Sequence, residues 1–469
     1  MTTAEATPTL TIADHADRGF FGHPKGLGYL AFTEAWERFS YYGMQTLLVL
    51  YMTKYLLLPG QIERVLLFDA FRRLPLYSGL DGQPLASAIF GTYAASVYLT
   101  PILGGLLADR VLGKRRTVLL GAITMALGHF LMAFEASFLF ALLCMVLGSG
   151  MFKGNIASQV GALYKPGDLR RADAFQIFYL GINAGVIISP LIVGTLGEKI
   201  GWHWGFGAAG VGMLIGLAIY LAGQKYLPAE HFLPQGRSAR ATEPRPAMAR
   251  ADWLALAAVL ILIPVMAVAI VPNNQIFNAY LVWGDEKFDL VFFGTRLPTS
   301  FLVTLDAIVS VSFLAIVALF YRWFSTRWKE PDELGKMIIG SLFSIGGMLC
   351  LATAAASAPD AQHKIGLFWP MMFELLNSIG FAHLLPVSLA LFTRLAPQAL
   401  NATVVGLYYL AFFGANAMVG WAGGFYETMP TPAFWVMHAG FAAASGAVFL
   451  IFKLVLARRL LHDPVTIDA

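Results

Sequence analysis

Twelve apolar segments, each long enough to cross a lipid bilayer as a helix, recur along the chain and constrain its fold. The composition agrees, because 58% of the residues are hydrophobic and only 13% are charged, whereas soluble domains carry about 25% charged residues. We therefore predict an all-α membrane protein and set water-soluble alternatives aside. The predicted spans are 28–58, 85–108, 115–135, 137–163, 173–195, 203–224, 252–271, 299–323, 334–357, 365–393, 401–427 and 431–457.

The clearest break in this pattern is a polar segment rich in Pro, Ala and Arg between spans six and seven. It divides the chain into two six-helix bundles, the pattern of two bundles around a central pathway. The first 25 or so residues show no signal-peptide pattern, so we expect the first span to act as the insertion signal. The predicted parts are a cytoplasmic segment 1–27, an N-terminal bundle 28–226, a cytoplasmic linker 227–250, a C-terminal bundle 251–457 and a cytoplasmic tail 458–469.

Lysines and arginines gather in the loops after spans two, four, six and eight and at the C-terminal end. By the positive-inside rule these loops lie on the cytoplasmic side, together with both termini. The net charge of +4 therefore gives no indication of nucleic-acid binding. The two cysteines, Cys144 and Cys350, lie in separate apolar runs and suggest neither a disulfide framework nor a metal site.

The first span contains charged and phenolic side chains where lipid would tolerate none: Glu34, Glu37, Arg38, Tyr41 and Tyr42. Helical spacing puts these five within an arc of roughly 140°. A charge near the bilayer centre costs a few kcal/mol or more unless it faces a polar interior. The two glutamates could form a structural ion-pair network between helices, but for Arg38 and its tyrosines a role facing a solute is favoured.

The loop after span two reads Gly104-Gly105-Leu-Leu-Ala-Asp109-Arg110, followed by Val-Leu-Gly113 and three basic residues. The glycines would let two helices approach closely, and Asp109 could hold an arginine or a helix N-terminus. We interpret Asp109 and Arg110 as a breakable conformational latch. The spacing resembles the loop signature of the major facilitator superfamily.

Span four places a lysine, Lys153, within an apolar run and without a nearby acid in the sequence. Gly150 and Gly154 around it form a pattern typical of close helix packing. Lys153 could snorkel to the surface, but its depth favours a partner from another helix or from a solute. Asn183 in span five could equally bridge helices or contact a ligand.

Several motifs together resemble the proton-dependent oligopeptide transporter (POT, or PTR) family of the major facilitator superfamily. They are Glu-x-x-Glu-Arg-Phe-x-Tyr-Tyr in span one, Tyr98-Leu-Thr-Pro-Ile-Leu-Gly-Gly in span two, Lys153-Gly-Asn-Ile in span four and Phe-Tyr-Leu-Gly-Ile-Asn183 in span five. The resemblance covers the whole N-terminal half, while the C-terminal half matches more loosely, for example in Gly406-Leu-Tyr-Tyr. It implies the major facilitator fold and uptake of di- and tripeptides together with protons.

The resemblance also assigns roles to individual residues. Glu34, Glu37 and Arg38 match the coupling motif, and a further set matches peptide-contacting positions. That set comprises Arg38, Tyr41, Tyr42, Tyr98, Lys153 and Asn183 in the N-terminal bundle, with Asn278 and Tyr408 expected from the C-terminal bundle. Arg38 and Lys153 offer cations to a peptide carboxylate, and tyrosines accept varied side chains.

The sequence departs from the family in the C-terminal bundle. Residues 271–278 contain no carboxylate where the family commonly has an acid, and Phe381 replaces the glutamate of a Gly-Glu pair. The linker is also too short for the two extra helices that bacterial members often insert. Because a buried cation needs a counter-charge, we favour Asp306 as the substitute amine partner or proton site. A helix-packing role for Asp306 stays open.

Two further residues of span ten could take part in this chemistry. Glu374 is a second candidate counter-charge, unless it lies near the membrane surface and is merely solvated. His383 titrates near neutrality, but its spacing from Phe381 favours packing against a neighbouring helix.

We therefore predict a proton-coupled peptide symporter that works by alternating access. It would be a multi-pass protein of the bacterial inner (plasma) membrane, functional as a monomer, with no cofactor, no metal and no nucleic-acid partner. Two alternatives remain: the same fold carrying another amphipathic or anionic solute, or a peptide sensor that no longer couples to protons. No nucleophile–base pair, metal spacing or phosphate-binding loop indicates an enzyme.

Overall fold

The computed structural model describes residues 17–165, 168–228, 250–360, 362–396 and 401–455. The N-terminal half is helical throughout its ordered elements. Its α-helices are α1 (Lys25–Tyr51), α2 (Phe68–Arg72), α3 (Gly82–Leu107), α4 (Lys114–Leu131), α5 (Phe138–Ala162), α6 (Arg170–Ser189) and α7 (Trp202–Gly223). Four π-helical segments extend them at Met52–Leu56, Ala108–Leu112, Pro190–Gly194 and Leu196–Ile200, and 3₁₀ turns lie at Ile62–Arg64, Glu135–Ser137 and Gln224–Tyr226.

The C-terminal half adds a small β-hairpin to its helices. Its α-helices are α8 (Arg250–Asn274), α9 (Ala279–Lys287), α10 (Phe301–Phe324), α11 (Glu333–Ser357), α12 (Phe368–Leu395), α13 (Asn401–Gly423) and α14 (Thr431–Val455). A 3₁₀ turn, Gln275–Phe277, separates α8 from α9. Strands β1 (Val291–Phe292) and β2 (Thr295–Arg296) pair antiparallel, with Val291 opposite Arg296.

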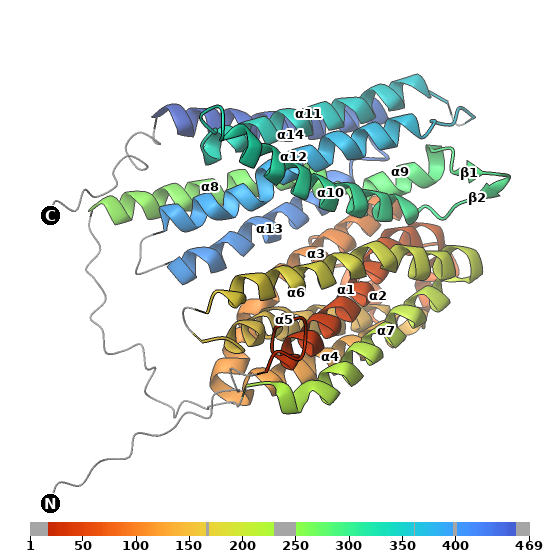
Figure 1. The fold of residues 1–469 in the computed structure, drawn as a ribbon. Coiled ribbons are helices and arrows are strands. Elements are labelled where there is room, and N and C mark those ends of the chain that lie inside the picture. The colour runs from red at the N-terminus through yellow and green to blue at the C-terminus, as the bar shows by residue number, and fades with distance from the viewer. Residues whose placement is uncertain (1–16, 166–167, 229–249, 361, 397–400, 456–469) are drawn as a thin grey trace, which may run out of the picture.

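The helices form two groups that lie side by side along their length (Figure 1). In the N-terminal bundle α1 packs on α6 and α7, and α5 packs on α3 and α4; in the C-terminal bundle α11 packs on α12 and α14, and α8 packs on α13. The groups meet where α3 contacts α13 and where α6 contacts α10. This is the two-bundle arrangement that the sequence predicts for the major facilitator fold.

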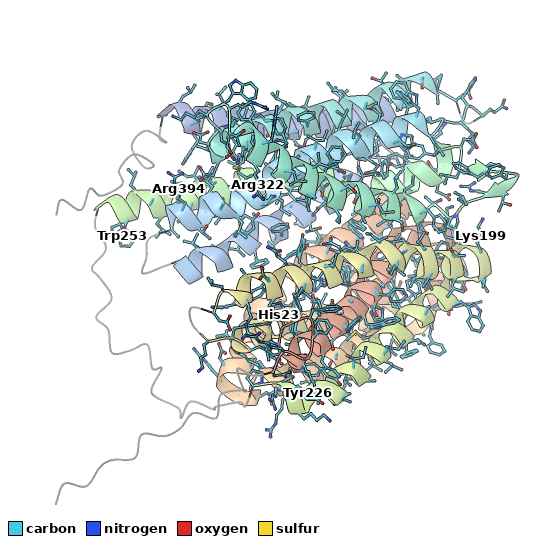
Figure 2. All side chains as sticks on the ribbon, viewed as in Figure 1. His23, Lys199, Tyr226, Trp253, Arg322 and Arg394 are labelled. Carbon is cyan, nitrogen blue, oxygen red and sulfur yellow. The ribbon has the colours of Figure 1, made fainter. Side chains whose placement is uncertain are left out.

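The two ends of the molecule differ in what they carry. We call the end with α2, α9 and the β-hairpin the hairpin end, and the end where α1 begins and α14 finishes the terminal end. Arg322 and Arg394 lie at the terminal end of the C-terminal bundle, whereas Lys199 lies at the hairpin end (Figure 2). The basic residues of the predicted cytoplasmic loops thus share one end with the beginning of α1.

The predicted spans agree with the long helices to within a few residues at most boundaries. The prediction for span seven was wrong at its end, because the helix predicted over 252–271 continues to Asn274 and then, after the 3₁₀ turn, to Lys287. The short helix α2 and the β-hairpin were not predicted. Most of the predicted linker 227–250, and most or all of the predicted terminal segments 1–27 and 458–469, lie outside the described residues.

Among the described residues, nine helices are long and apolar enough to cross a membrane. Large apolar side chains such as Leu214 of α7, Leu319 of α10 and Leu450 of α14 are exposed on the outside of the bundles. Exposed leucines at these positions are consistent with contact to lipid, whose hydrocarbon core they match.

Asp332 fixes the start of α11 at the terminal end. Its carboxylate accepts hydrogen bonds from the Gly335 N–H at 2.8 Å and from Lys453 Nζ of α14 at 2.6 Å. Partial burial opposes ionisation, but these bonds outweigh it and lower the pKa of Asp332 below its usual value. The residue therefore caps α11 and ties it to α14.

Close helix approach depends on glycine at a few positions. A Cβ on Gly104 would lie 2.1 Å from the Gly150 carbonyl oxygen, and one on Gly91 of α3 would lie 2.4 Å from Cα of Gly420 on α13. The prediction for Gly154 was wrong: an added Cβ there meets no atom within 4 Å, because this side of α5 faces away from α3. The α3–α5 contact therefore depends on Gly104 and Gly150.

Gly104→Ala should destabilise the N-terminal bundle, because the methyl group would overlap the backbone of α5. Overpacking of this kind costs about 1–3 kcal/mol, which should lower the apparent Tm of the purified protein in detergent. Gly105→Ala is the matched control, since a Cβ on Gly105 meets nothing within 4 Å. Equal Tm values for the two variants would contradict this account of the contact.

Candidate functional site

An acid–base cluster occupies the middle of α1. Arg38 Nε donates a hydrogen bond to Glu34 Oε1 at 2.8 Å and lies 2.9 Å from Glu37 Oε2. All three side chains are buried, with Glu37 fully inaccessible. One guanidinium nitrogen therefore serves both carboxylates, which compensates part of the desolvation of these charges.

Both carboxylates contact the same side of the guanidinium group. No hydrogen bond joins the terminal nitrogens of Arg38 to a described residue, and neither oxygen of Glu37 has a hydrogen-bond partner there. The planar fork of Arg38 thus keeps donors that fit a carboxylate bidentately. Glu37 keeps acceptor capacity that a proton could satisfy.

Lys153 of α5 lies against two of the predicted tyrosines. Its Nζ is 4.0 Å from the ring centroid of Tyr41 and 5.6 Å from that of Tyr98. Aromatic faces stabilise an ammonium group without neutralising it. Because no described carboxylate lies within salt-bridge distance of Lys153, its three donors stay available to a ligand.

Tyr42 links the charged face of α1 to the C-terminal bundle. Its hydroxyl interacts electrostatically with Arg38 and Glu37 of α1 and with Asp306 of α10. Its ring lies 5.9 Å from that of Phe277, in the turn before α9. The structure therefore brings the predicted cations, the tyrosines and Asp306 to the interface between the bundles.

Asp306 is partly exposed and has a polar environment of its own. Ser310 Oγ donates to its Oδ1 at 3.3 Å and also contacts Ser378 Oγ of α12 at 3.0 Å. The neighbouring acid is Glu374 of α12, which interacts electrostatically with Asp306. The alternative that Glu374 is merely solvated is wrong, because its side chain is 0% exposed.

Three further predicted contact residues have partners within the protein. Asn183 Nδ2 donates to the Tyr179 carbonyl one turn earlier, at 2.9 Å. Asn278 is fully buried between the bundles: Ser87 donates to its Oδ1 at 3.0 Å and its Nδ2 donates to the Val419 carbonyl at 3.3 Å. In this conformation Asn278 holds the bundles together and does not face the cations.

Tyr408 also lies one layer behind the cations. Its hydroxyl shares a 2.8 Å hydrogen bond with Ser388 Oγ, and its ring packs on Phe412, which in turn stacks on Tyr98 at 5.0 Å. It therefore positions an aromatic neighbour of Tyr98.

The two positions at which the sequence departs from the family are occupied by uncharged groups. Phe381 is half-buried, and His383 is held by the Ile379 carbonyl and by Tyr321 of α10 at 3.1 Å, which agrees with the expected packing role. In the segment 271–278, Gln275 pairs with His438 at 2.9 Å. No carboxylate replaces the missing acids at these positions themselves.

The bundles are joined by hydrogen bonds in the half of the molecule nearest the hairpin end. Lys54 pairs with Asp285. Glu198 accepts from the N–H of Thr299 at 2.7 Å and of Ser300 at 2.8 Å, directly before α10. An anion at a helix N-terminus is favoured by the helix dipole. Glu198 therefore binds the start of α10 to the N-terminal bundle, and we call this contact the Glu198 clasp. Sequence reasoning missed Glu198, since beside Lys199 it resembles a charge-balanced loop.

No such hydrogen bond joins the bundles at the terminal end within the described ranges. Asp109 and Arg110, the predicted latch, are both exposed there, in the π-helical segment Ala108–Leu112, and have no ion pair with a described residue. The latch stays a prediction. In the described part of the chain, the hydrogen bonds between the bundles thus lie toward the hairpin end and not at the terminal end.

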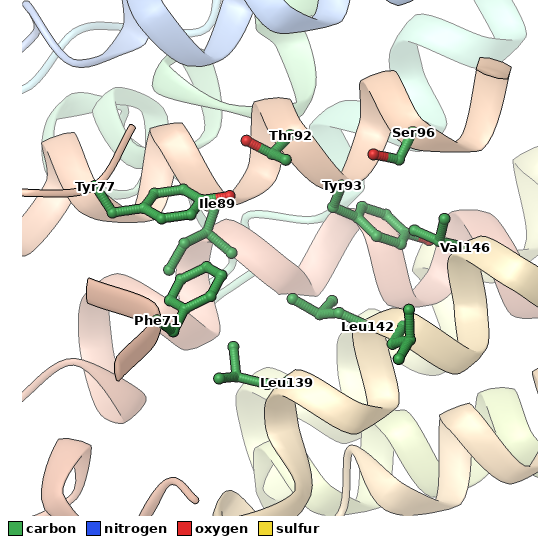
Figure 3. Close-up of a pocket in the computed structure, with 10 residues that line it drawn as sticks. Phe71, Tyr77, Ile89, Thr92, Tyr93, Ser96, Leu139, Leu142 and Val146 are labelled. Atoms are coloured by element: carbon green, nitrogen blue, oxygen red, sulfur yellow. The ribbon is translucent and has the colours of Figure 1, made fainter. Parts of the chain in front are cut away.

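A separate cavity of about 280 Å³ lies between α3, α5 and the α2 region (Figure 3). Phe71 and Tyr77 stack on each other at 4.2 Å on one side, and Tyr93 points toward Val146 on the other. Its lining is mainly apolar and holds no charged side chain. Tyr93 also interacts electrostatically with Glu37, so the cavity borders the cluster around Arg38.

Comparison with known proteins identifies the class and then the family. The two-bundle fold matches a crystal structure of a peptide transporter POT in complex with sulfate, with a TM-score of 0.79 and 28% identity over 93% of this chain and 96% of that one. The fold is that of a major facilitator-type membrane transporter. The model of the POT family matches residues 115–237 and 247–434, and the chain therefore belongs to the POT family.

Two curated relatives agree with this assignment. The peptide transporter YePEPT of Yersinia enterocolitica is 30% identical over 95% of this chain and 97% of its own length. A di-/tripeptide transporter of Lactococcus lactis subsp. cremoris is 32% identical over 96% of this chain and 83% of its own length.

Glu198→Ala should loosen the hairpin end, because two backbone N–H groups before α10 would lose their acceptor. Spin labels on cysteines introduced at the exposed positions Leu66 and Phe293, in a protein whose Cys144 and Cys350 are replaced by Ser, would report the separation of the bundles. We expect a longer mean distance in the Glu198→Ala protein. Glu63→Ala is the control, since that carboxylate accepts only from Gly60 of its own loop; a matching shift in the control would contradict the clasp.

Proposed function

We propose that this protein is a proton-coupled symporter of di- and tripeptides that works by alternating access in a bacterial inner membrane. The observation that carries the proposal is the placement of unlike charges on the two bundles. Arg38 and Lys153 contact tyrosines of the N-terminal bundle, and Asp306 of the C-terminal bundle lies within electrostatic range of Tyr42. Membership of the POT family and the peptide-transporting relatives support it.

This arrangement suits a zwitterion whose ends are constant and whose side chains vary. The free terminal nitrogens of Arg38 and the ammonium of Lys153 would bind the peptide carboxylate. Asp306 would bind the peptide amine, and Tyr41, Tyr42 and Tyr98 would form adaptable walls. The roles that we propose for Asn183, Asn278 and Tyr408 require either another conformation or an indirect contact, because their polar groups have protein partners here.

Proton coupling would use the α1 cluster. Protonation of Glu37 would neutralise its carboxylate and weaken its ion pair with Arg38. The guanidinium group would then interact with Glu34 and with the peptide carboxylate. Protonation and peptide binding would therefore change the same ion-pair network, which allows one to bias the other. The coupling ion is the proton, and we propose no further cofactor and no enzymatic step.

The asymmetry of the two ends suggests which state the structure represents. With the basic terminal end placed in the cytoplasm by the positive-inside rule, the hairpin end faces outward. The bonds of Glu198 and Lys54 would then close the outer gate, and the protein would be open toward the cytoplasm.

The test is uptake of labelled dialanine into liposomes that contain the purified protein, with and without an inward proton gradient. Symport with one proton should concentrate the peptide up to about tenfold for each pH unit of gradient. Equilibration without accumulation would overturn the coupling and favour a sensor. Competition by N-acetylated peptides as strong as that by free dipeptides would favour an anionic solute, which the acid-free segment 271–278 makes the second candidate.

Glu37→Gln and Glu34→Gln should each strongly lower gradient-driven accumulation, because the α1 cluster would no longer exchange a proton against Arg38. Counterflow of labelled against unlabelled peptide should persist, since exchange needs no net proton movement. Glu135→Gln, which changes a glutamate bonded to Tyr55 at the far end of the bundle, is the control. Intact accumulation in both variants would remove the α1 glutamates from the coupling mechanism.

A further inference from the structure

Glu374 is a buried acid that the proposed mechanism does not yet use. It lies in the second turn of α12 from the hairpin end and is 0% exposed. Neither of its carboxyl oxygens has a hydrogen-bond partner of regular geometry among the described residues. Such a group is costly to bury when ionised, so its protonation state depends on its neighbours.

Two titratable groups interact directly with Glu374: Asp306 of α10 and Tyr280 of α9. Further away, Cys350 of α11 interacts with Tyr280, and Tyr42 of α1 interacts with Asp306. None of them carries a positive charge. Neither Glu374 nor Asp306 forms a salt bridge with a described lysine, arginine or histidine. Ser310 and Ser378, each four residues after one of the acids, are in contact at 3.0 Å, so the packing of α10 on α12 also places Asp306 beside Glu374. The acids therefore have each other as their principal charged partners.

Ionising both carboxyl groups in this position costs much more than ionising one, because like charges at short range and low dielectric repel strongly. One proton held between them leaves a single negative charge. That charge can be compensated by one ammonium group, such as the amine of a bound peptide. Asp306 is the partly exposed member and the only one of the two that a solute can reach.

We propose that Asp306 and Glu374 together form a second proton-binding site, located in the C-terminal bundle and carrying one shared proton. Asp306 would exchange this proton with the transport pathway, and Glu374 would hold it when the peptide amine occupies Asp306. When the shared proton is released to the pathway, the pair gains one negative charge; when it is taken up again, the pair returns to a single charge. The inference rests on the proposed symport.

The position of the pair connects it to the closed hairpin end. Asp306 lies nearly two turns after the residues that Glu198 binds, Thr299 and Ser300, and two residues after Thr304, whose hydroxyl donates to the Ile187 carbonyl of α6 at 3.0 Å. α10 therefore carries both the inter-bundle bonds and the exposed acid. A second negative charge on the pair would act on the same short stretch of α10 that holds the gate.

The test compares accumulation plateaus in liposomes that hold the full-length protein. Glu374→Gln keeps the shape of the side chain but cannot gain or lose a proton, so the transported proton count should fall by one. The plateau for dialanine at a one-unit pH gradient should then be about tenfold lower than in the wild type. Counterflow should remain, which shows that the variant is folded and binds peptide.

Asp306→Asn should lower the plateau by the same factor, and the double variant should lower it no further, because the two residues share one proton. Glu374→Asp retains a carboxyl group and should keep a plateau above that of Glu374→Gln. Glu286→Gln is the matched control: it is another acid of this bundle bonded to a tyrosine, at 2.8 Å from the Tyr426 hydroxyl, but without a second acid.

An unchanged plateau in Glu374→Gln, or equal losses in Glu374→Gln, Glu374→Asp and Glu286→Gln, would overturn the inference. A double variant that loses the product of the two single effects would contradict the shared proton. If the wild type itself does not accumulate peptide, the proposed symport fails. Wild-type accumulation with no effect of Glu374→Gln rejects the second proton site alone.

Discussion

The contact of Arg38 with Glu34 and Glu37 is the interaction on which the rest of the site depends. A lone guanidinium at this depth in a membrane would be expensive to bury, and two carboxylates at 2.8 and 2.9 Å make it possible. Both acids contact the same nitrogen of the Arg38 guanidinium group. Its remaining N–H donors are therefore not used by the acids. The contact of both acids with one nitrogen allows the Arg38 guanidinium group to be buried. The same contact leaves its other nitrogens available to a ligand.

The cost of burying a charge also applies to the C-terminal bundle, where the buried groups are acids. The family position of Phe381 and the segment 271–278 hold no acid, yet two acids gather at Asp306 and Glu374. The acids of the C-terminal bundle therefore lie elsewhere than in the family pattern. Asp306 lies on α10, the eighth span, and Glu374 lies on α12, the tenth span, about two turns before Phe381. In the proposed mechanism, this pair supplies the negative charge that complements the two cations of the N-terminal bundle.

Much of the fold could be predicted from the sequence, because a span in lipid must be apolar over a fixed length. The ends of α5 and α11 fall within one residue of their predictions. The continuation of span seven to Lys287 could not be predicted, since the turn at Gln275–Phe277 is stabilised by partners distant in sequence, such as His438. The charged residues of α1 were visible as charges in an apolar run. Asn278 and Glu374 could also be recognised as polar residues in apolar runs. Only the three-dimensional structure shows that Asn278 is buried between the bundles, where a peptide contact was expected. It likewise shows that Glu374 is buried beside another acid and is not solvated.

The approach of Gly91 to Gly420 has a consequence for movement. Where most helices of this protein interlock through side chains, α3 and α13 meet here through bare backbone, with no room for even a methyl group. A smooth contact between two rods can roll without any rotamer having to change, whereas interdigitated side chains must first disengage. This close contact between the two halves therefore allows their relative rotation without a rearrangement of side chains.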